Sequence, residues 1–326
     1  MRVAYLDLCP FSFFEDYSIR PKRYGGGRVF ASHLKEFDEF EVFANSKCFD
    51  NIQPWERLEH CNNLTEEQIQ KINAGESVCA VVPKIAEFDL LVHVHYSSFL
   101  NLAGSKLKEL VWIPGIDAQI HPHFEHVLLY NGWQNPKFGN PAGRRYRFSL
   151  GVEIPEFYVR EKENFIFQCS RHVDCFNSIS IAKFAKNHGI KAVFAGPIAD
   201  GYPLMDYIDG ETTVYLGSIS EDCKMNYIAK ASIMTLCHSW PTPFSLSAVE
   251  SLSLGTPVVA SMTGFWPTLI QHGKNGFFAH NEAELLKAWE SRNSISQTNC
   301  FLTACKYSLH EMLETVWRAF EEVLKT

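Results

Sequence analysis

The sequence has no long apolar run and no paired cysteines. No stretch approaches the roughly 20 apolar residues of a membrane-spanning helix, so any membrane contact would be peripheral. The opening run MRVAYLDLCP is too short for a signal peptide and predicts a first strand. Ten cysteines are scattered without a C-x-x-C pair, which argues against a zinc ribbon or a dithiol redox motif. Single thiols in apolar runs are typical of a reducing compartment, so we expect a cytoplasmic protein.

Positive charge and metal motifs are also scarce. The chain has 30 Lys and Arg against 37 Asp and Glu, a formal net charge of −7. This balance argues against a nucleic-acid partner bound through a broad basic surface. No Asp-x-Asp motif occurs, and His121 and His123 with Glu125 form only a weak i, i+2 pattern interrupted by Pro122. We therefore expect no metal.

The 326 residues are enough for two hydrophobic cores, and the first half alternates short apolar strands with amphipathic stretches. The glycine-rich loop Tyr24-Gly25-Gly26-Gly27 follows the first strand and precedes a predicted helix, Arg28–Phe37. Segment 131–148 is polar and predicts loops, with a basic cluster at Arg144, Arg145 and Arg147 that is either a solvated strand edge or a contact for an anionic acceptor. The other predicted strands are Arg2–Leu8, Glu41–Ala44, Asp89–His95, Leu110–Ile113 and Val127–Tyr130, and the other predicted helices are 65–74, capped near Asn63, and Val78–Phe88. This alternation indicates a parallel, doubly wound α/β sheet.

The alternation starts again after SLGVEIPEFYVREKEN, so we place a domain boundary near residue 155. The first domain is 1–155 and the second is 156–307. The predicted strands are Phe165–Cys169, Lys191–Ala195, Thr213–Leu216 and Ile233–Cys237, and the predicted helices are Ser178–His188, Glu221–Ala231, Glu282–Ser291 and Ser308–Leu324. This pattern indicates a second doubly wound sheet. The last helix has a wide apolar stripe that needs a partner.

Segment Ser239–Phe278 carries the strongest functional pattern. Thr242 is a good helix N-cap, Pro243 a good first residue, and Gly255 a good left-handed stop before a buried strand, Pro257–Ser261. The exposed N–H groups at such a helix start bind anions. Glu250 lies about two turns in, where its carboxylate would reach ribose hydroxyls. Phosphate at the helix start and sugar hydroxyls further along describe a nucleotide-sugar site.

The run PFSLSAVESLSLGTPVVAS, followed by Gly264, Pro267, Ile270, Gly273 and Gly276, closely resembles the donor-site signature of glycosyltransferase family 4. The resemblance implies a GT-B fold, two Rossmann-like domains facing across a cleft. It also implies a retaining, metal-independent hexosyltransferase of polysaccharide biosynthesis, without a cofactor. Such an enzyme moves sugar from a nucleotide-diphosphate sugar to a glycan or glycolipid hydroxyl. The first domain would bind the acceptor, the second the donor, and helix 308–324 would pack back on the first.

The resemblance and the strand ends together assign site residues. Arg171 follows a strand where the family starts its phosphate clamp, and a guanidinium fork suits phosphate oxygens. His95 and Asp117 lie at strand ends of the first sheet, where a polar residue contacts sugar or acceptor; these three are the candidate catalytic residues. The candidate donor-binding residues are Gly26, Gly27, Gly217, Ile219, Thr242, Phe244, Ser245, Leu246, Ser247 and Glu250.

The sequence departs from the family pattern at two places. The family has two glutamates eight positions apart; the second matches Glu250, but the first falls at Thr242. The family also has a lysine five or six residues after the clamp arginine, where this chain has Phe176 and Asn177. These departures leave open a catalytically impaired GT-B pseudoenzyme that binds a nucleotide, a glycan or a partner. A nucleotide-sugar epimerase is disfavoured, because its cleft carboxylates and histidines cannot be placed.

Overall fold

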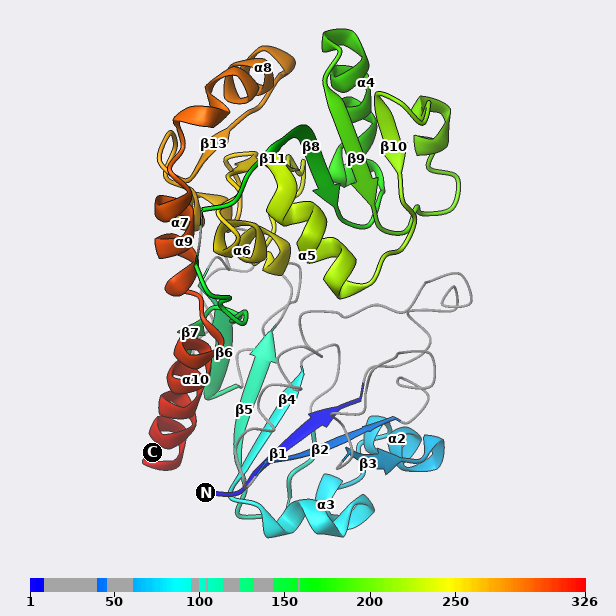
Figure 1. Ribbon diagram of the computed structural model, residues 1–326. Helices are drawn as coiled ribbons and strands as arrows, with labels where there is room; N and C mark the ends of the chain where they lie inside the picture. The colour runs from blue at the N-terminus through cyan, green and yellow to red at the C-terminus, as the bar shows by residue number, and fades with distance from the viewer. Residues whose placement is uncertain are drawn as a thin grey trace. The chain divides into compact units, whose positions relative to one another are not determined.

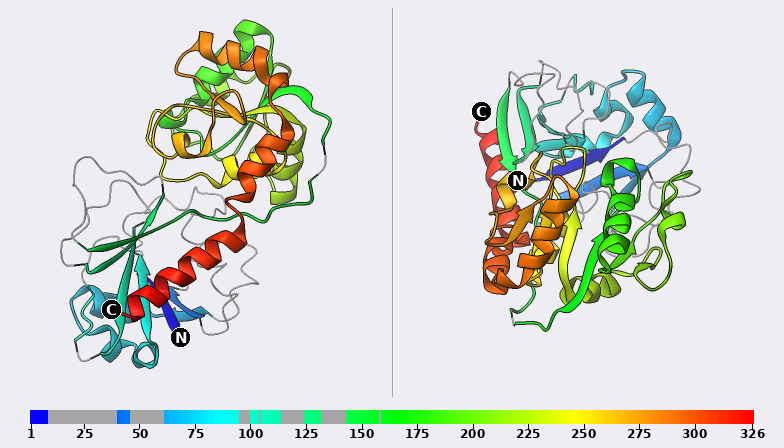
Figure 2. Two further views of the ribbon diagram at one scale, coloured as in Figure 1. Left: turned by 90° about the vertical axis from the view of Figure 1, so that its left-hand side faces the viewer. Right: turned by 90° about the horizontal axis from the view of Figure 1, so that it is seen from above.

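The structure is a computed structural model that describes residues 1–8, 40–45, 61–94, 100–103, 105–113, 124–131, 143–157 and 159–326. The chain divides into two compact units: unit 1 is Met1–Leu150 with Met312–Thr326, and unit 2 is Gly151–Glu311. Each unit is built on one parallel sheet with helices packed on it (Figures 1 and 2). The predicted fold class, two doubly wound α/β sheets, is therefore confirmed.

The described strands of unit 1 form a seven-stranded sheet in the order β3-β2-β1-β4-β5-β6-β7. Every neighbouring pair is parallel. The first six positions follow the doubly wound order that changes direction between two central strands, here β1 and β4. The strands are β1 (Val3–Asp7), β2 (Phe40–Asn45), β3 (Cys61–Leu64), β4 (Leu90–Val94), β5 (Lys108–Ile113), β6 (His126–Tyr130) and β7 (Arg144–Phe148).

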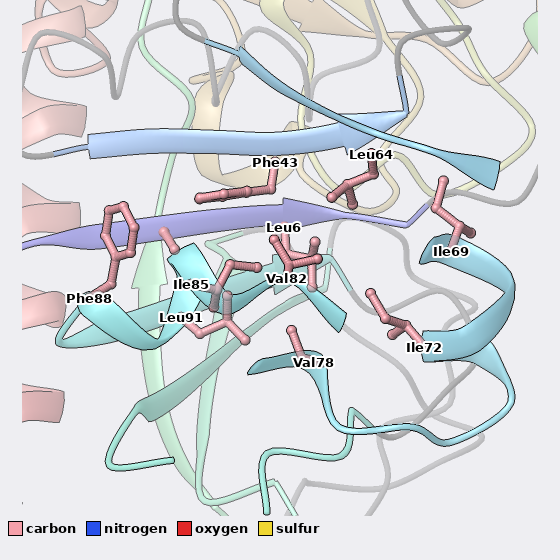
Figure 3. Packing of buried hydrophobic residues seen from close by; sticks show 11 residues of the cluster. Leu6, Phe43, Leu64, Ile69, Ile72, Val78, Val82, Ile85, Phe88 and Leu91 are labelled. Atoms are coloured by element: carbon pink, nitrogen blue, oxygen red, sulfur yellow. The ribbon is translucent and has the colours of Figure 1, made fainter. Parts of the chain in front are cut away.

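One face of this sheet packs against α2 (Glu66–Asn73) and α3 (Val78–Val81). Figure 3 shows aliphatic and aromatic side chains of the strands and of these helices meeting in one buried cluster. Its labelled members are Leu6, Phe43, Leu64, Ile69, Ile72, Val78, Val82, Ile85, Phe88 and Leu91. These residues come from β1 to β4, from α2 and from segment 78–88, and the sequence patterns predicted all of these elements except β3.

Two helical predictions in unit 1 need correction. The surface helix is capped by Thr65 rather than Asn63: Thr65 and Gln68 form a reciprocal capping box. The predicted helix Val78–Phe88 stops at Val81 and continues as a 3₁₀ turn, Pro83–Glu87. Pro83 has no N–H to donate back into an α-helix, so the chain tightens there.

Strands β3 and β7 were not predicted. β7 lies within the segment expected to be loop, at the edge of the sheet beyond β6. Tyr146 and Phe148 are buried while Arg145 and Arg147 are exposed, so the strand is half solvated and its sequence is polar. The basic cluster therefore lies on a strand edge, which was one of the two interpretations of it.

The chain enters unit 2 at residue 151, and the closing helix α10 (Leu309–Leu324) returns to unit 1 from Met312. Val152 N–H donates to the Tyr307 carbonyl (3.0 Å) and Leu309 N–H donates to the Val152 carbonyl (2.9 Å), so the two crossing segments lie side by side. In Figures 1 and 2, α10 runs beside β6 and β7. Its buried stripe is Met312, Val316, Ala319, Phe320 and Val323.

The sheet of unit 2 has the order β10-β9-β8-β11-β12-β13, and all its pairs are parallel. Its strands are β8 (Glu163–Cys169), β9 (Lys191–Ala195), β10 (Thr213–Tyr215), β11 (Ala231–Leu236), β12 (Val258–Ala260) and β13 (Gly276–Phe278). Its helices are α4 (Ser178–His188), α5 (Glu221–Lys230), α6 (Leu246–Ser253), α7 (Trp266–Leu269), α8 (Glu282–Ser291) and α9 (Gln297–Cys305). Short 3₁₀ turns occur at Asp174–Phe176, Leu204–Tyr207 and Arg292–Ser294.

Sequence patterns located α4, β9 and α8 with their observed bounds but missed β13 and α9. β13 has only three residues, and a Cβ at Gly276 would overlap the Val258 carbonyl oxygen, so this edge strand requires a glycine. α9 is short and has no charged residue, which leaves little amphipathic pattern. It packs against α6.

Seven cysteines are free thiols: Cys79, Cys169, Cys175, Cys223, Cys237, Cys300 and Cys305. Among the residues that the structure describes, no helix combines the length and the apolar character needed to cross a membrane.

Candidate functional site

The sheet order of unit 2 identifies one edge as the expected ligand position. The strand order reverses between the central strands β8 and β11, and ligands of doubly wound sheets bind at the carboxyl ends of strands at such a point. Ser170 and Arg171 follow β8, and Cys237 and His238 follow β11. The loop after β11 leads directly into α6, the helix predicted to bind an anion.

Helix α6 starts later than predicted. Its N-cap is Ser245, whose hydroxyl accepts from Ala248 N–H (3.3 Å), and its first residue is Leu246. The amides of Leu246 and Ser247 have no hydrogen-bond partner among the described residues, as is usual for a first helical turn. The positive end of the helix dipole adds to these donors, so the start of α6 has the geometry of an anion site. Gly255 takes the predicted left-handed conformation (φ +70°) after the helix ends.

Thr242 does not cap this helix, because its side-chain hydroxyl and its backbone carbonyl both form hydrogen bonds elsewhere. Its hydroxyl pairs with His238 Nδ1 (2.9 Å), and its carbonyl accepts from Phe265 N–H (2.7 Å). Gly264 supports the second contact: a Cβ there would lie 2.5 Å from the Thr242 oxygen. The loop that precedes α6 is therefore fixed to the turn that follows β12.

His238 is a site residue that sequence analysis missed. Its side chain is buried edge-on between Phe176 (4.3 Å between ring centroids) and Trp266 (5.5 Å). Burial lowers the pKa of His238 to about 4, so the ring is neutral at physiological pH. Its Nε2 has no hydrogen-bond partner among the described residues. The sequence feature that could have identified His238 is its spacing of four residues from Thr242, but whether the two side chains meet depends on the loop geometry.

Glu250 lies on α6 beside a lysine that the sequence did not single out. Lys224 Nζ, on α5, lies 2.8 Å from Glu250 Oε2 and 2.6 Å from Glu221 Oε1. The side chains of Lys224 and Glu250 are 15% and 14% exposed, whereas that of Glu221 is 62% exposed. The largely buried pair places the Glu250 carboxyl group just over one turn from the first residue of α6, nearer to the helix start than the two turns expected from the sequence.

Arg171 is exposed and makes no ion pair or hydrogen bond with any described residue. The nearby cations do not replace the lysine that the family pattern places after it. His172 is buried with Nδ1 on the Ser178 hydroxyl (2.7 Å) and Nε2 on the Ala195 carbonyl (3.2 Å). Lys183 lies over the Tyr207 ring, and Lys224 faces two carboxylates.

The remaining predicted residues of unit 2 have mixed surroundings. Gly217 has φ +71° and its carbonyl accepts from Gly196 N–H (2.8 Å), so it forms the turn that leads past the half-buried Ile219 to α5. Phe244 is buried against Phe265 (4.6 Å between centroids) and supports the loop from inside. Ser247 is half-buried in the first turn of α6.

The structure thus brings Thr242, Ser245, Leu246, Ser247 and Glu250 together around one helix. Gly26, Gly27, His95 and Asp117 lie outside the described residues, and so do His121 and His123. No group of three or more His, Cys, Asp or Glu in the described part of the chain is arranged to hold a metal ion.

Comparison with known proteins agrees with this geometry. Residues 165–296 match the family model described as "Glycosyl transferases group 1", a span from β8 to the start of α9. No curated protein matches the chain.

Solved structures share the GT-B fold over nearly the whole chain. HepE (Alr3699) from Anabaena, solved in complex with UDP, is 14% identical with a TM-score of 0.74, covering 99% of this chain and 100% of that one. A glycosyltransferase from Rickettsia africae is 14% identical with a TM-score of 0.74, covering 100% and 99%. A sucrose-phosphate synthase from Thermosynechococcus elongatus is 12% identical with a TM-score of 0.69, covering 100% of both chains. At these identities the likeness shows the fold alone.

Proposed function

We propose that this chain is a retaining glycosyltransferase that moves a hexose from a nucleotide-diphosphate sugar to a hydroxyl of a glycan or glycolipid. The observation that carries the proposal is the surroundings of α6: free amides at its start and a largely buried carboxyl group about one turn further in. The match to the group 1 glycosyltransferase model covers this helix. HepE has also been solved with UDP-glucose, which makes UDP-sugars the first donors to test.

The residues divide the work of binding. The amides of Leu246 and Ser247 would receive the diphosphate, and the exposed guanidinium of Arg171 would donate to its oxygens. Glu250 would accept hydrogen bonds from the ribose hydroxyls. The turn at Gly217 would lie against the base. These contacts fix the donor without a metal ion or cofactor.

The chemistry needs stabilisation of a leaving group. Negative charge develops on the departing diphosphate, so fixed donors aimed at it lower the barrier. In a front-face mechanism the leaving phosphate itself takes the proton of the acceptor hydroxyl, and no protein base is needed. We assign to Arg171 the role of stabilising that charge. His95 and Asp117 are proposed to contact sugar and acceptor from unit 1.

The test is a panel of UDP-, GDP- and ADP-sugars, with nucleotide release and isothermal titration calorimetry as the measurements. We expect one base to bind and its sugar to be transferred or slowly hydrolysed, and NMR of the product to show the donor's anomeric configuration. Added EDTA should leave the rate unchanged. If no nucleotide sugar binds, the proposal fails.

A second candidate function is a GT-B pseudoenzyme that binds a nucleotide without transfer. Thr242 favours it, because its hydroxyl is already bonded to His238 where the family pattern has a sugar-binding carboxylate. Tight donor binding with neither hydrolysis nor transfer to any of a range of glycan acceptors would support this alternative.

A further inference from the structure

The ion pair between α5 and α6 does more than join two helices. Lys224 lies 2.8 Å from Glu250 Oε2 and also contacts Glu221, whose side chain is mostly in solvent. A partly exposed pair such as Lys224–Glu221 contributes little to stability. The pair with Glu250 is different, because both of its side chains are largely buried and the carboxylate is the predicted ribose contact.

The two oxygens of Glu250 have different surroundings. Oε2 is buried and pairs with Lys224 Nζ at 2.8 Å. Oε1 makes no hydrogen bond or ion pair with the described residues. The lysine thus holds Oε2 and leaves Oε1 as the oxygen that can accept from a ligand.

The charge of Glu250 depends on this lysine. Burial raises the pKa of Glu250, and Lys224 opposes that shift while the Glu221 carboxylate adds to it. The other elements packed against α6 are β11, β12 and α9, all fully described, and none has a charged residue; the thiols of Cys300 and Cys305 are their titratable groups. Burial raises the pKa of Cys300 to about 12, so it stays neutral. Among the described residues, Lys224 is therefore the cation that faces this carboxyl.

We propose that Lys224 is a positioning residue that keeps Glu250 a carboxylate and turns its Oε1 toward the ribose of the nucleotide. The proposal rests on the proposed function of this site. It assigns to α5 a part in nucleotide binding that the donor-site motif around α6 does not contain. A carboxylate accepts hydrogen bonds more strongly than the protonated acid, so nucleotide affinity should follow the charge of this group.

The test is the pH dependence of nucleotide binding by Lys224→Met, which keeps the apolar stem and removes the charge. The probe is whichever of UDP, GDP and ADP the wild type binds most tightly, titrated by calorimetry from pH 5.5 to pH 8.5. Expressing each Kd relative to wild type at the same pH cancels the titration of the ligand's own phosphate. We expect the variant to bind about tenfold more weakly, relative to wild type, at pH 5.5 than at pH 8.5, because burial without the neighbouring cation favours the protonated form of Glu250.

Two matched variants separate charge from packing. Lys224→Arg restores a cation and should restore the wild-type pH profile. Glu221→Gln removes the exposed carboxylate on the same lysine and should leave affinity within about twofold of wild type at every pH. A Lys224→Met protein that binds like wild type, or is weakened equally at every pH, would overturn the proposal.

A measurement on the unmodified protein covers the case in which Lys224→Met fails to fold. Carbon-13 NMR of labelled glutamate side chains, assigned through Glu250→Gln, reports the titration of Glu250 directly. We expect Glu250 of the wild type to be ionised at the pH at which the nucleotide binds; a protonated Glu250 at that pH would refute the role of Lys224. Failure of wild type to bind any of the three nucleotides would instead reject the proposed function.

Discussion

Replacing Glu250 with Gln tests the ribose contact by changing one atom and one charge. The amide has almost the shape of the carboxylate, so α6 and its packing against α9 should persist. The change removes the charged acceptor at Oε1 and the ion partner of Lys224 at Oε2. Nucleotide affinity and folding stability should therefore both fall, and the size of each loss can be estimated separately.

The binding effect follows from one charge-assisted hydrogen bond. Such a bond contributes about 1.5–3 kcal/mol, and each 1.4 kcal/mol is a factor of ten, so the Kd of the nucleotide should rise about ten- to hundredfold. Removing a partner from a fully buried ion pair costs about 3–5 kcal/mol. Here Lys224 is 15% exposed and keeps Glu221 at 2.6 Å, so we expect a smaller loss of stability, roughly 1–3 kcal/mol.

The assay is a double cycle in calorimetry, which pairs Glu250→Gln with a 2′,3′-dideoxy form of the preferred nucleotide. If Oε1 accepts from the ribose, the dideoxy ligand loses affinity on the wild type and loses almost nothing more on the variant. Glu221→Gln is the matched control, because it removes an exposed acid from the same lysine. Equal losses from removing the hydroxyls in wild type and variant would refute the ribose contact.

Three further predictions concern the groups around α6. Gly264→Ala should destabilise the protein by roughly 2–4 kcal/mol in urea unfolding, because the backbone there is left-handed and the new Cβ would lie 2.5 Å from the Thr242 oxygen. Gly273 is also left-handed but has no atom within 4 Å of an added Cβ, so Gly273→Ala should cost only about 1–2 kcal/mol. Equal losses would contradict this reasoning. His238 has a pKa of about 4 in the folded state, below its unfolded value, so the unfolded state takes up the proton first and the free energy of unfolding should fall as pH drops from about 6.5 to 4. In His238→Gln this fall should be smaller by roughly 2–4 kcal/mol. An unchanged fall would exclude His238 as its source. Arg171→Ala should weaken nucleoside diphosphate binding about ten- to hundredfold and nucleoside binding hardly at all; equal effects on the two ligands would show that Arg171 does not contact phosphate.

The sequence predicted the parts of unit 2 whose structure is set by neighbours along the chain. α4, β9 and α8 have the expected bounds, and Gly255 takes the left-handed conformation that ends α6. Buried parallel strands and capped helices leave such local patterns, and the alternation of the two fixes the fold class. The short strand β13, which begins with Gly276, and the uncharged helix α9 have almost no such local pattern.

The site was predicted only in outline. Helix α6 and Glu250 were predicted from the sequence, but the helix starts three residues later than Pro243, because Thr242 bonds to His238 and Phe265 rather than capping it. Local propensity favoured Thr242 and Pro243 as a helix start. The contact with the turn at Gly264 overrides that preference, and no local pattern reports it.

By itself, the sequence determined two doubly wound sheets and a helix start suited to an anion, because periodicity, glycine positions and capping residues act over a few neighbouring residues. Only the tertiary structure decided which side chains meet at that helix. Lys224 reaches Glu250 because the packing of α5 beside α6 brings two distant segments within 2.8 Å, and His238 reaches Thr242 because the loop folds back onto β11. Contacts of this kind depend on how helices and loops pack, and the spacing of residues along the chain does not specify that packing.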